Sequence, residues 1–270
     1  MNAKREPPAR RVMIGLEPAM LDAAALAAAA RLAQSVGAEL AALFVEDINL
    51  LRWASLPFAQ EIGAASAARR PVAAADIERA LRVQAEQLKR ALAQGVQHLE
   101  LQWTFEVARG QGLRVLLEYA GTSDIVVLAG SAGRFTWQPA LEALLKSAFS
   151  FELAAPGCVA AALGSGPEAM RVLSAAHTLA QASDAELVLL IFGEAAREGG
   201  IAEQAAAWLR ERGAAARIAL MPDHEPRQIA ELIERERVQA LFWPGGDHEL
   251  RNLEIAALAS VISCPLMVVK

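Results

Sequence analysis

The chain has 270 residues, of which 54% are apolar and 21% carry a charge, and its net charge at pH 7 is −5. This composition is typical of a globular protein with a well-packed core, and it excludes a largely disordered chain. The acidic balance argues against nucleic acid as a main partner, because contacts to phosphate backbones need a basic surface. The length suggests one large domain or two ordinary ones.

The sequence carries no sign of a membrane span or an export signal. No apolar stretch approaches the roughly 20 residues that a spanning helix needs. The first residues, MNAKREPPARR, lack the apolar core of a secretory signal. The two cysteines, Cys158 and Cys264, each open an apolar run, which is typical of buried, reduced thiols. We therefore expect a cytoplasmic protein that does not associate with a membrane.

The first predicted elements are a strand that opens at Arg11, an amphipathic helix, and a second strand over 38–45. The helix and second strand, residues 26–44, align without a gap with residues 173–191. Leu-Ala-Gln and Ala-Glu-Leu recur at matching places in the two segments. The chain is therefore predicted to be a tandem repeat with an offset of 147 residues.

Residues 48–82 are predicted to be an insert that the second copy lacks, since that copy passes from Phe192 to its next helix in a few residues. Its first part, residues 48–70, is rich in apolar side chains and leaves the carboxyl end of the second strand. This position suits a lid over a ligand or an apolar surface for a partner. A short helix packed on its own domain is the alternative. The candidate contact residues are Leu51, Trp53 and Phe58.

The remaining apolar runs predict further strands. They lie at 103–108, 125–129, 158–163, 216–221, 240–243 and 264–269. Because these strands alternate with helical segments, they predict parallel sheets covered on both faces. We expect an α/β protein with two tandem doubly wound domains, at 11–157 and 158–270.

Two complete five-stranded copies need ten strands, and the sequence shows nine. Cys158–Leu163 is the first strand of the second copy by the repeat offset. By its Pro-Gly-Cys-Val opening it resembles the last strand of the first copy instead. We favour the first assignment, because that strand is central to a doubly wound sheet. The first domain would then lack its edge strand or borrow one.

The order and spacing of these segments resemble the universal stress protein family over nearly the whole chain after residue 11. The matches include the opening strand that ends in an acid, Glu17, and Asp124–Gly130 as the fourth strand. Glu106–Gly110 resembles the third strand and Cys264–Val269 the fifth. The resemblance implies a Rossmann-like fold with strand order 3-2-1-4-5 in each domain. It says less about activity.

Many members of that family bind ATP through a glycine-rich loop after the fourth strand. The first copy keeps half of the motif, and the residues that the resemblance implies for a nucleotide site are Glu17, Gly130, Ser131, Gly133 and Arg134. Further along, Ala143-Leu144 replaces the expected glycine and hydroxyl. The second copy is more degraded. We therefore expect no resident cofactor. The alternative is that ATP or AMP binds in the first domain. If no nucleotide binds, the glycines at 130 and 133 are explained by a tight turn of the backbone.

Other candidate chemistry is sparse. Asp-His-Glu occurs at 223–225 and at 247–249, and these residues are interpreted as polar turns rather than metal ligands. His98 and His177 are interpreted as surface residues. No nucleophile–base motif is present, and Ser131 has no base that the sequence identifies, so we expect no enzyme.

The sequence thus predicts a non-catalytic regulatory protein of the stress response that acts by binding a ligand or an unknown protein partner. An adenine-nucleotide sensor that uses the first domain is the alternative, and a nucleotide hydrolase is a second one. The two domains are expected to pair as an intrachain pseudo-dimer, and a homodimer is also open.

Overall fold

The computed structural model describes residues 11–16, 23–62, 69–97, 99–122, 124–129, 157–164, 166, 168–192, 200–245 and 249–270. The strands of the main sheet are β1 (Arg11–Leu16), β2 (Glu39–Asp47), β5 (Trp103–Gly110), β6 (Ile125–Leu128), β7 (Cys158–Leu163), β8 (Glu186–Phe192), β9 (Arg217–Met221), β10 (Val238–Pro244) and β11 (Leu266–Val269). The helices are α1 (Ala23–Val36), α2 (Ile48–Ala54), α3 (Ala74–Val96), α4 (Gly112–Tyr119), α6 (Ala169–Ala182), α8 (Gly200–Arg210), α9 (Pro226–Glu236) and α10 (Glu249–Val261). A small second sheet pairs β3 (Gln60–Ile62) with β4 (Arg69–Pro71).

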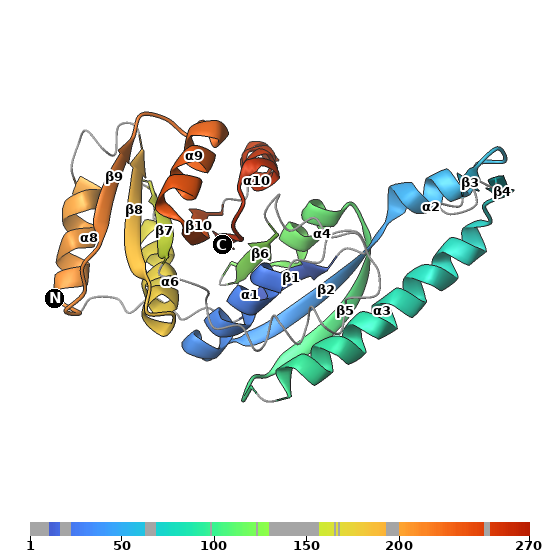
Figure 1. Ribbon diagram of the computed structural model, residues 1–270, viewed down its shortest axis with the longest axis horizontal. Coiled ribbons are helices and arrows are strands. Elements are labelled where there is room, and N and C mark those ends of the chain that lie inside the picture. The colour runs from blue at the N-terminus through green and yellow to red at the C-terminus, as the bar shows by residue number, and fades with distance from the viewer. Residues whose placement is uncertain are drawn as a thin grey trace.

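The main sheet has nine strands in the order β5-β2-β1-β6-β11-β10-β7-β8-β9 (Figure 1). Neighbouring strands in this sheet are parallel, except that β6 and β11 pair antiparallel. The α/β class with helices on both faces is confirmed. Each half has the predicted strand order, with β11 as the fifth strand of both, so the first half borrows its edge strand and one continuous sheet runs through both halves.

Strand β11 joins the two halves. It pairs in parallel with β10 on one side, and on the other side Leu266 lies opposite Leu128 and Val269 opposite Ile125 of β6. It therefore occupies the place beside β6 that a fifth strand of the first half would take. Cys158–Leu163 is β7, between β8 and β10, so its assignment to the second half is confirmed.

Further hydrogen bonds reinforce this junction, which we call the seam, near the ends of β6 and β11. The guanidinium of Arg171, on α6, donates to the carbonyl oxygens of Thr122 and Lys270. The backbone N–H of Lys270 donates to the carbonyl of Asp124 at 3.1 Å, and its Nζ donates to the carbonyl of Leu117 at 2.9 Å. Because these bonds link segments that are far apart in the chain, the two halves are fixed to each other at β6 and β11.

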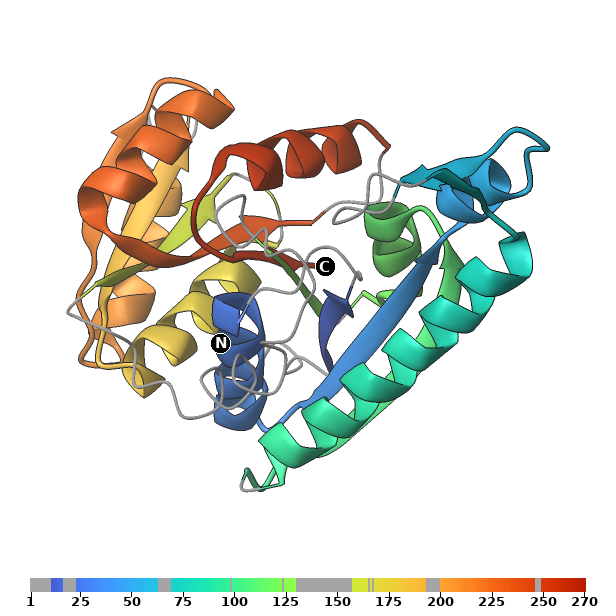
Figure 2. The same ribbon diagram turned by 45° about the vertical axis from the view of Figure 1, so that its right-hand side comes forward.

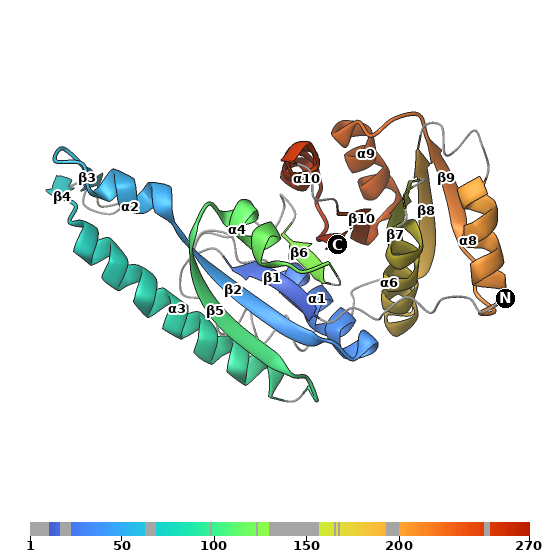
Figure 3. The same cartoon turned by 180° about the vertical axis from the view of Figure 1, so that it is seen from behind.

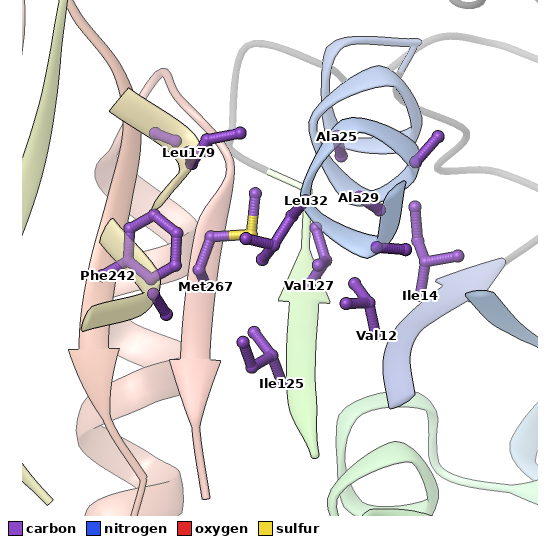
Figure 4. Close-up of a cluster of buried hydrophobic side chains, with 14 of the residues drawn as sticks. Val12, Ile14, Ala25, Ala29, Leu32, Ile125, Val127, Leu179, Phe242 and Met267 are labelled. Carbon is purple, nitrogen blue, oxygen red and sulfur yellow. The ribbon is translucent and has the colours of Figure 1, made fainter. Parts of the chain in front are cut away.

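Each face of the sheet carries its own core, because successive strand side chains point to opposite faces. Helices α1, α3, α6 and α8 cover one face, and α4, α9 and α10 cover the other. Figure 4 shows the first core at the seam, where Leu32 of α1, Val127 of β6 and Met267 of β11 lie close together. No helix among the described residues is long and apolar enough to cross a membrane.

Candidate partner-binding surface

The insert at 48–82, which we call the arm, lies at the β5 end of the molecule, far from β9 (Figures 1 and 3). It contains α2, the β3–β4 hairpin and the first turns of α3. Helix α3 has 23 residues and is about 34 Å long. Its first fully buried residue is Leu81, and Ile77 in the turn before is partly buried against the same core. The arm therefore joins the first core through a few side chains of α2 and α3.

Local hydrogen bonds explain where α2 begins and ends. The carboxylate of Asp47 accepts a hydrogen bond from the backbone N–H of Asn49 at 2.8 Å, which caps the first turn. At the other end, the hydroxyl and the N–H of Ser55 both donate to the carbonyl of Leu51. The N–H of Val72 donates to the carbonyl of Ala59 and closes the hairpin that follows. The described residues of the arm thus have hydrogen bonds of their own.

One side of α2 packs against α3. Leu51 is only 9% exposed and belongs to the same core cluster as Leu81 of α3, and Ala54 is also buried. Leu51 therefore holds α2 in place, and its side chain is not available to a partner in the way that the sequence analysis proposed. Burial of one leucine side chain contributes about 1.5–3 kcal/mol.

The other side of the arm exposes large apolar side chains. Phe58 is 74% exposed, Ile62 65% and Trp53 43%. Leu50 and Leu56 are exposed in the same segment. Single exposed apolar residues are ordinary on protein surfaces, but five within thirteen residues of the sequence are an unusual density of exposed apolar side chains, which favours an interaction site. Of the three candidate residues, Trp53 and Phe58 present their side chains to solvent, and their role in binding stays a prediction.

An ionic network fixes the base of the arm. Arg109, on β5, donates from Nε and Nη2 to Oε2 of Glu46, both at 3.0 Å, and from Nη2 to Oε1 of Glu78 on α3 at 3.4 Å. The hydrogen bond to Glu46 raises the pKa of Arg109. Glu46 is almost fully buried, and the guanidinium of Arg109 supplies the opposite charge that offsets the cost of burying its carboxylate. The network ties the end of β2 to α3 where the arm leaves the sheet.

The arm differs in charge from the rest of the chain. Residues 48–82 contain five arginines and three carboxylates, a net charge of +2, within a chain of net charge −5. The described arginines of this segment, Arg52, Arg69, Arg70, Arg79 and Arg82, are all exposed. A basic segment with exposed aromatic and aliphatic side chains is complementary to an acidic surface that has apolar contacts of its own.

The predicted nucleotide site falls on Glu17, Gly130, Ser131, Gly133 and Arg134, and all five lie outside the described residues. The strands that lead to them are described. β1 and β6 are parallel neighbours, with Ile14 opposite Val127, so their carboxyl ends meet at one edge of the sheet. This is the edge at which ligands bind in doubly wound sheets.

Gly245, at the end of β10, has a packing explanation. A Cβ on Gly245 would come within 2.9 Å of Cγ1 of Val268 and 3.0 Å of the carbonyl oxygen of Val269. Gly245 therefore allows the end of β10 to approach β11 closely. This close approach explains why a glycine is present at position 245 without assuming that the loop binds a phosphate.

The Asp-His-Glu segment at 223–225 serves the start of α9. Asp223 Oδ1 accepts from the N–H of Glu225 at 3.0 Å, and Glu225 accepts from Gln228 at 2.7 Å. The ring of His224 stacks on Phe192 with the ring centroids 4.4 Å apart. Within the described ranges, no group of three His, Cys, Asp or Glu side chains is placed to hold a metal ion. The second Asp-His-Glu segment, 247–249, lies mostly outside those ranges.

Sequence reasoning missed an aromatic cluster on the second half of the sheet. Phe192 on β8 and Trp243 on β10 have ring centroids 5.5 Å apart, although β7 lies between their strands. Ala160 and Ala162 of β7 belong to the same core cluster as both rings, and their small side chains leave room for the rings to meet above β7. His224 contacts both rings. The run of three alanines at 160–162 on a central strand was the available signal.

His177 is also placed differently from the sequence prediction. It was interpreted as a surface residue, and the structure buries it to 7% exposure on α6. Its ring meets the edge of Trp208 at a centroid distance of 5.4 Å, and the guanidinium of Arg212 lies 3.8 Å from the Trp208 ring centroid. Burial, followed by the charge of Arg212, lowers the pKa of His177. His98 lies outside the described residues.

The fold is that of universal stress proteins. No family model matches the chain, and no curated protein matches its sequence. Among solved structures, a universal stress protein from Archaeoglobus fulgidus DSM 4304 matches with a TM-score of 0.56 at 12% identity, over 96% of both chains. A functionally unknown protein from Pseudomonas aeruginosa PAO1 matches with a TM-score of 0.49 at 13% identity, over 97% of this chain and 92% of its own. The predicted resemblance is confirmed at the level of the fold.

Proposed function

We propose that this chain is a non-catalytic regulatory protein of the stress response, and that it acts by binding a protein partner through the arm. The supporting observation is that five large apolar side chains within residues 50–62 are exposed, Phe58 above all. A purely structural insert would be expected to turn these side chains inward. The stress-response assignment rests on the shared fold.

The partner's contact surface is acidic and contains apolar side chains. This follows from the net charge of +2 on residues 48–82 and from the exposed arginines of the same segment. Association would be steered by charge and therefore weaken with added salt. Trp53 and Phe58 would be buried against the partner in the complex, and they would supply most of the binding free energy.

The two halves take the place of two protomers in this proposal. Strand β11 closes the open side of β6, so the first half needs no second chain to complete its sheet. We infer an intrachain pseudo-dimer, and the arm remains the surface at which another molecule binds.

The test compares captured proteins from the native source with three forms of the chain. We expect the wild type to retain one dominant acidic protein, and the Trp53→Ser/Phe58→Ser variant to lose it. Ile218→Ser/Leu220→Ser is the matched control, because those side chains are exposed on β9 at the other end of the sheet. Equal capture by all three forms would exclude the arm. Binding of the wild type to anionic vesicles, lost in the arm variant, would indicate a membrane surface and contradict the proposal.

The alternative function is adenine-nucleotide sensing by the first domain. It is favoured by the adjacent carboxyl ends of β1 and β6, from which the predicted site residues continue. Mass spectrometry of small molecules released from the denatured, freshly purified protein tests this alternative. Near-stoichiometric ATP or AMP would support it, and its absence, with no thermal shift on added nucleotide, would count against it.

A further inference from the structure

A pocket of about 220 Å³ lies between α1 and α6, which pack side by side across the seam (Figure 2). Ala24, Ala27, Ala28 and Arg31 line it from α1, at the i, i+3, i+4, i+7 spacing of one helix face. Residues of α6, of the amino ends of β7 and β10, and of the turn before β11 complete the lining. Since α1 belongs to the first half of the chain and the other elements to the second, the pocket is built from both halves.

The inner surface of the pocket is apolar. The lining residues that are buried all have apolar side chains or a thiol, and they are Ala27, Val159, Leu179, Val238, Ala240, Cys264 and Pro265. The alanines among them leave space that larger side chains would fill. The buried part of the lining therefore presents an apolar surface to any molecule in the pocket.

The polar residues of the lining do not change this character. Arg31, Ser183, Gln239 and Ser263 are half-buried or exposed, so they lie nearer to solvent. Arg31 and Gln239 already interact with other groups of the protein. The hydroxyl oxygen of Ser183 and Oε1 of Gln239 are not accessible to a water-sized probe, so these two atoms do not face the open space. A charged or strongly polar ligand would thus lose its hydration without gaining a buried side-chain partner.

We propose that this pocket binds a small neutral apolar molecule, of the class of alkylbenzenes and branched alkanes, in contact with both halves of the chain. Transfer of such a molecule from water to an apolar surface is favourable and needs no polar partner. The arm and the predicted nucleotide site involve none of the lining residues, so the inference is independent of the proposed function.

The volume limits the size of the ligand. An engineered apolar cavity of about 150 Å³ holds benzene, which has six heavy atoms. By proportion, about 220 Å³ holds roughly eight or nine heavy atoms, the size of ethylbenzene. Pockets for cofactors and drug-sized ligands are about 300–1,000 Å³, so a nucleotide does not fit this site.

Calorimetric titration with ethylbenzene tests the proposal, with benzyl alcohol and the benzylammonium ion as polar and charged probes of the same size. We expect saturable binding of one ethylbenzene molecule per chain. Benzyl alcohol should bind at least about tenfold more weakly and benzylammonium more weakly still, because neither polar group finds a buried partner. No saturable binding of ethylbenzene, or equal binding of the polar and charged probes, would overturn the proposal.

A pair of variants shows where ethylbenzene binds. Ala28→Leu should weaken its binding at least about tenfold, because the larger side chain fills the pocket from α1. Ala230→Leu is the matched control, since Ala230 is also half-buried but lies on α9 over the other face of the sheet. Equal binding by the wild type and both variants would place ethylbenzene elsewhere and contradict the proposal.

Xenon gives a second readout that needs no variant and holds even if Ala28→Leu does not fold. Apolar cavities of this kind bind xenon, which scatters X-rays strongly. In crystals of the wild-type chain under xenon pressure, we expect an ordered xenon atom in contact with Ala28, Leu179 and Ala240. If these crystals hold no xenon at this place, the pocket does not take apolar molecules and the proposal is wrong.

Discussion

His177 carries a testable consequence of its burial. Nε2 of this residue is buried and has no hydrogen-bond partner among the described residues, and the pKa of the ring is lowered. The unfolded chain therefore binds the proton more readily than the folded one. The contribution of neutral His177 to the free energy of unfolding is fully present above the ordinary histidine pKa of about 6.5, and it is lost as the pH falls below that value.

We expect the free energy of unfolding to decrease between pH 7 and pH 5.5, and His177→Phe to remove part of this decrease. Urea denaturation of both forms at the two pH values measures the difference. An identical pH dependence in the variant would show that His177 does not titrate with unfolding.

Asp124 is a second residue whose burial predicts a large effect. Its carboxylate is 3% exposed and accepts from Nη2 of Arg11 at 2.7 Å and from the N–H of Gly121 at 2.7 Å. The hydrogen bond between Asp124 and Arg11 raises the pKa of Arg11. Asp124→Ala should lower the free energy of unfolding by about 2–3 kcal/mol, since it leaves Arg11 and the N–H of Gly121 without this partner.

The control for Asp124 is Glu118→Ala. Glu118 pairs with Arg114 at 2.8 Å, but both side chains are well exposed. The change in unfolding free energy should stay within about 0.5 kcal/mol for such an exposed pair. Equal effects of the two variants in denaturant titrations would contradict the structural role of Asp124.

At the scale of elements, helix α2 determines which side chains of the arm face outward. Leu51 and Ala54 face α3, and Leu50 and Trp53 face solvent, each pair at a spacing of three. Leu51→Ala should therefore cost about 2–3 kcal/mol of unfolding free energy. Trp53→Ala should cost less than about 1 kcal/mol. Thermal or chemical denaturation of both variants checks the orientation, and the reverse ranking would show that α2 is rotated.

The elements themselves were largely predictable from the sequence, because buried parallel strands appear as short apolar runs between helical segments. All nine predicted strands are in the main sheet. For the candidate site, the sequence located the insert and its apolar content. It could not separate Leu51 from Trp53, because both are apolar and only packing against α3 decides which one is buried.

The sequence left open whether the first half lacks its edge strand or borrows one, and it could not identify β11 as the borrowed strand. The pairing of Leu266 with Leu128 joins segments that are far apart in the chain, and no local pattern encodes such a contact. His177 was missed for a similar reason, since its burial depends on Trp208 of a different helix. The nucleotide-site residues, such as Gly133, remain a prediction.

At the scale of the whole molecule, β11 is part of the sheet of both halves. Its Met267 pairs with Val127 in the first half and with Phe242 in the second, so unfolding of either half exposes a strand of the other. We expect one cooperative unfolding transition, with equal calorimetric and van't Hoff enthalpies in differential scanning calorimetry. Two resolved transitions would show that the halves are independent domains.

Site-specific photo-crosslinking in an extract of the native source tests whether the arm binds a protein partner. A photoreactive amino acid at position 58, where Phe58 is most exposed, should give one dominant crosslinked protein whose yield falls with added salt. The same amino acid in place of Leu220, on β9 at the opposite end of the sheet, should not capture that protein. Crosslinks at position 58 that are absent, or that match those at position 220, would contradict the proposed function.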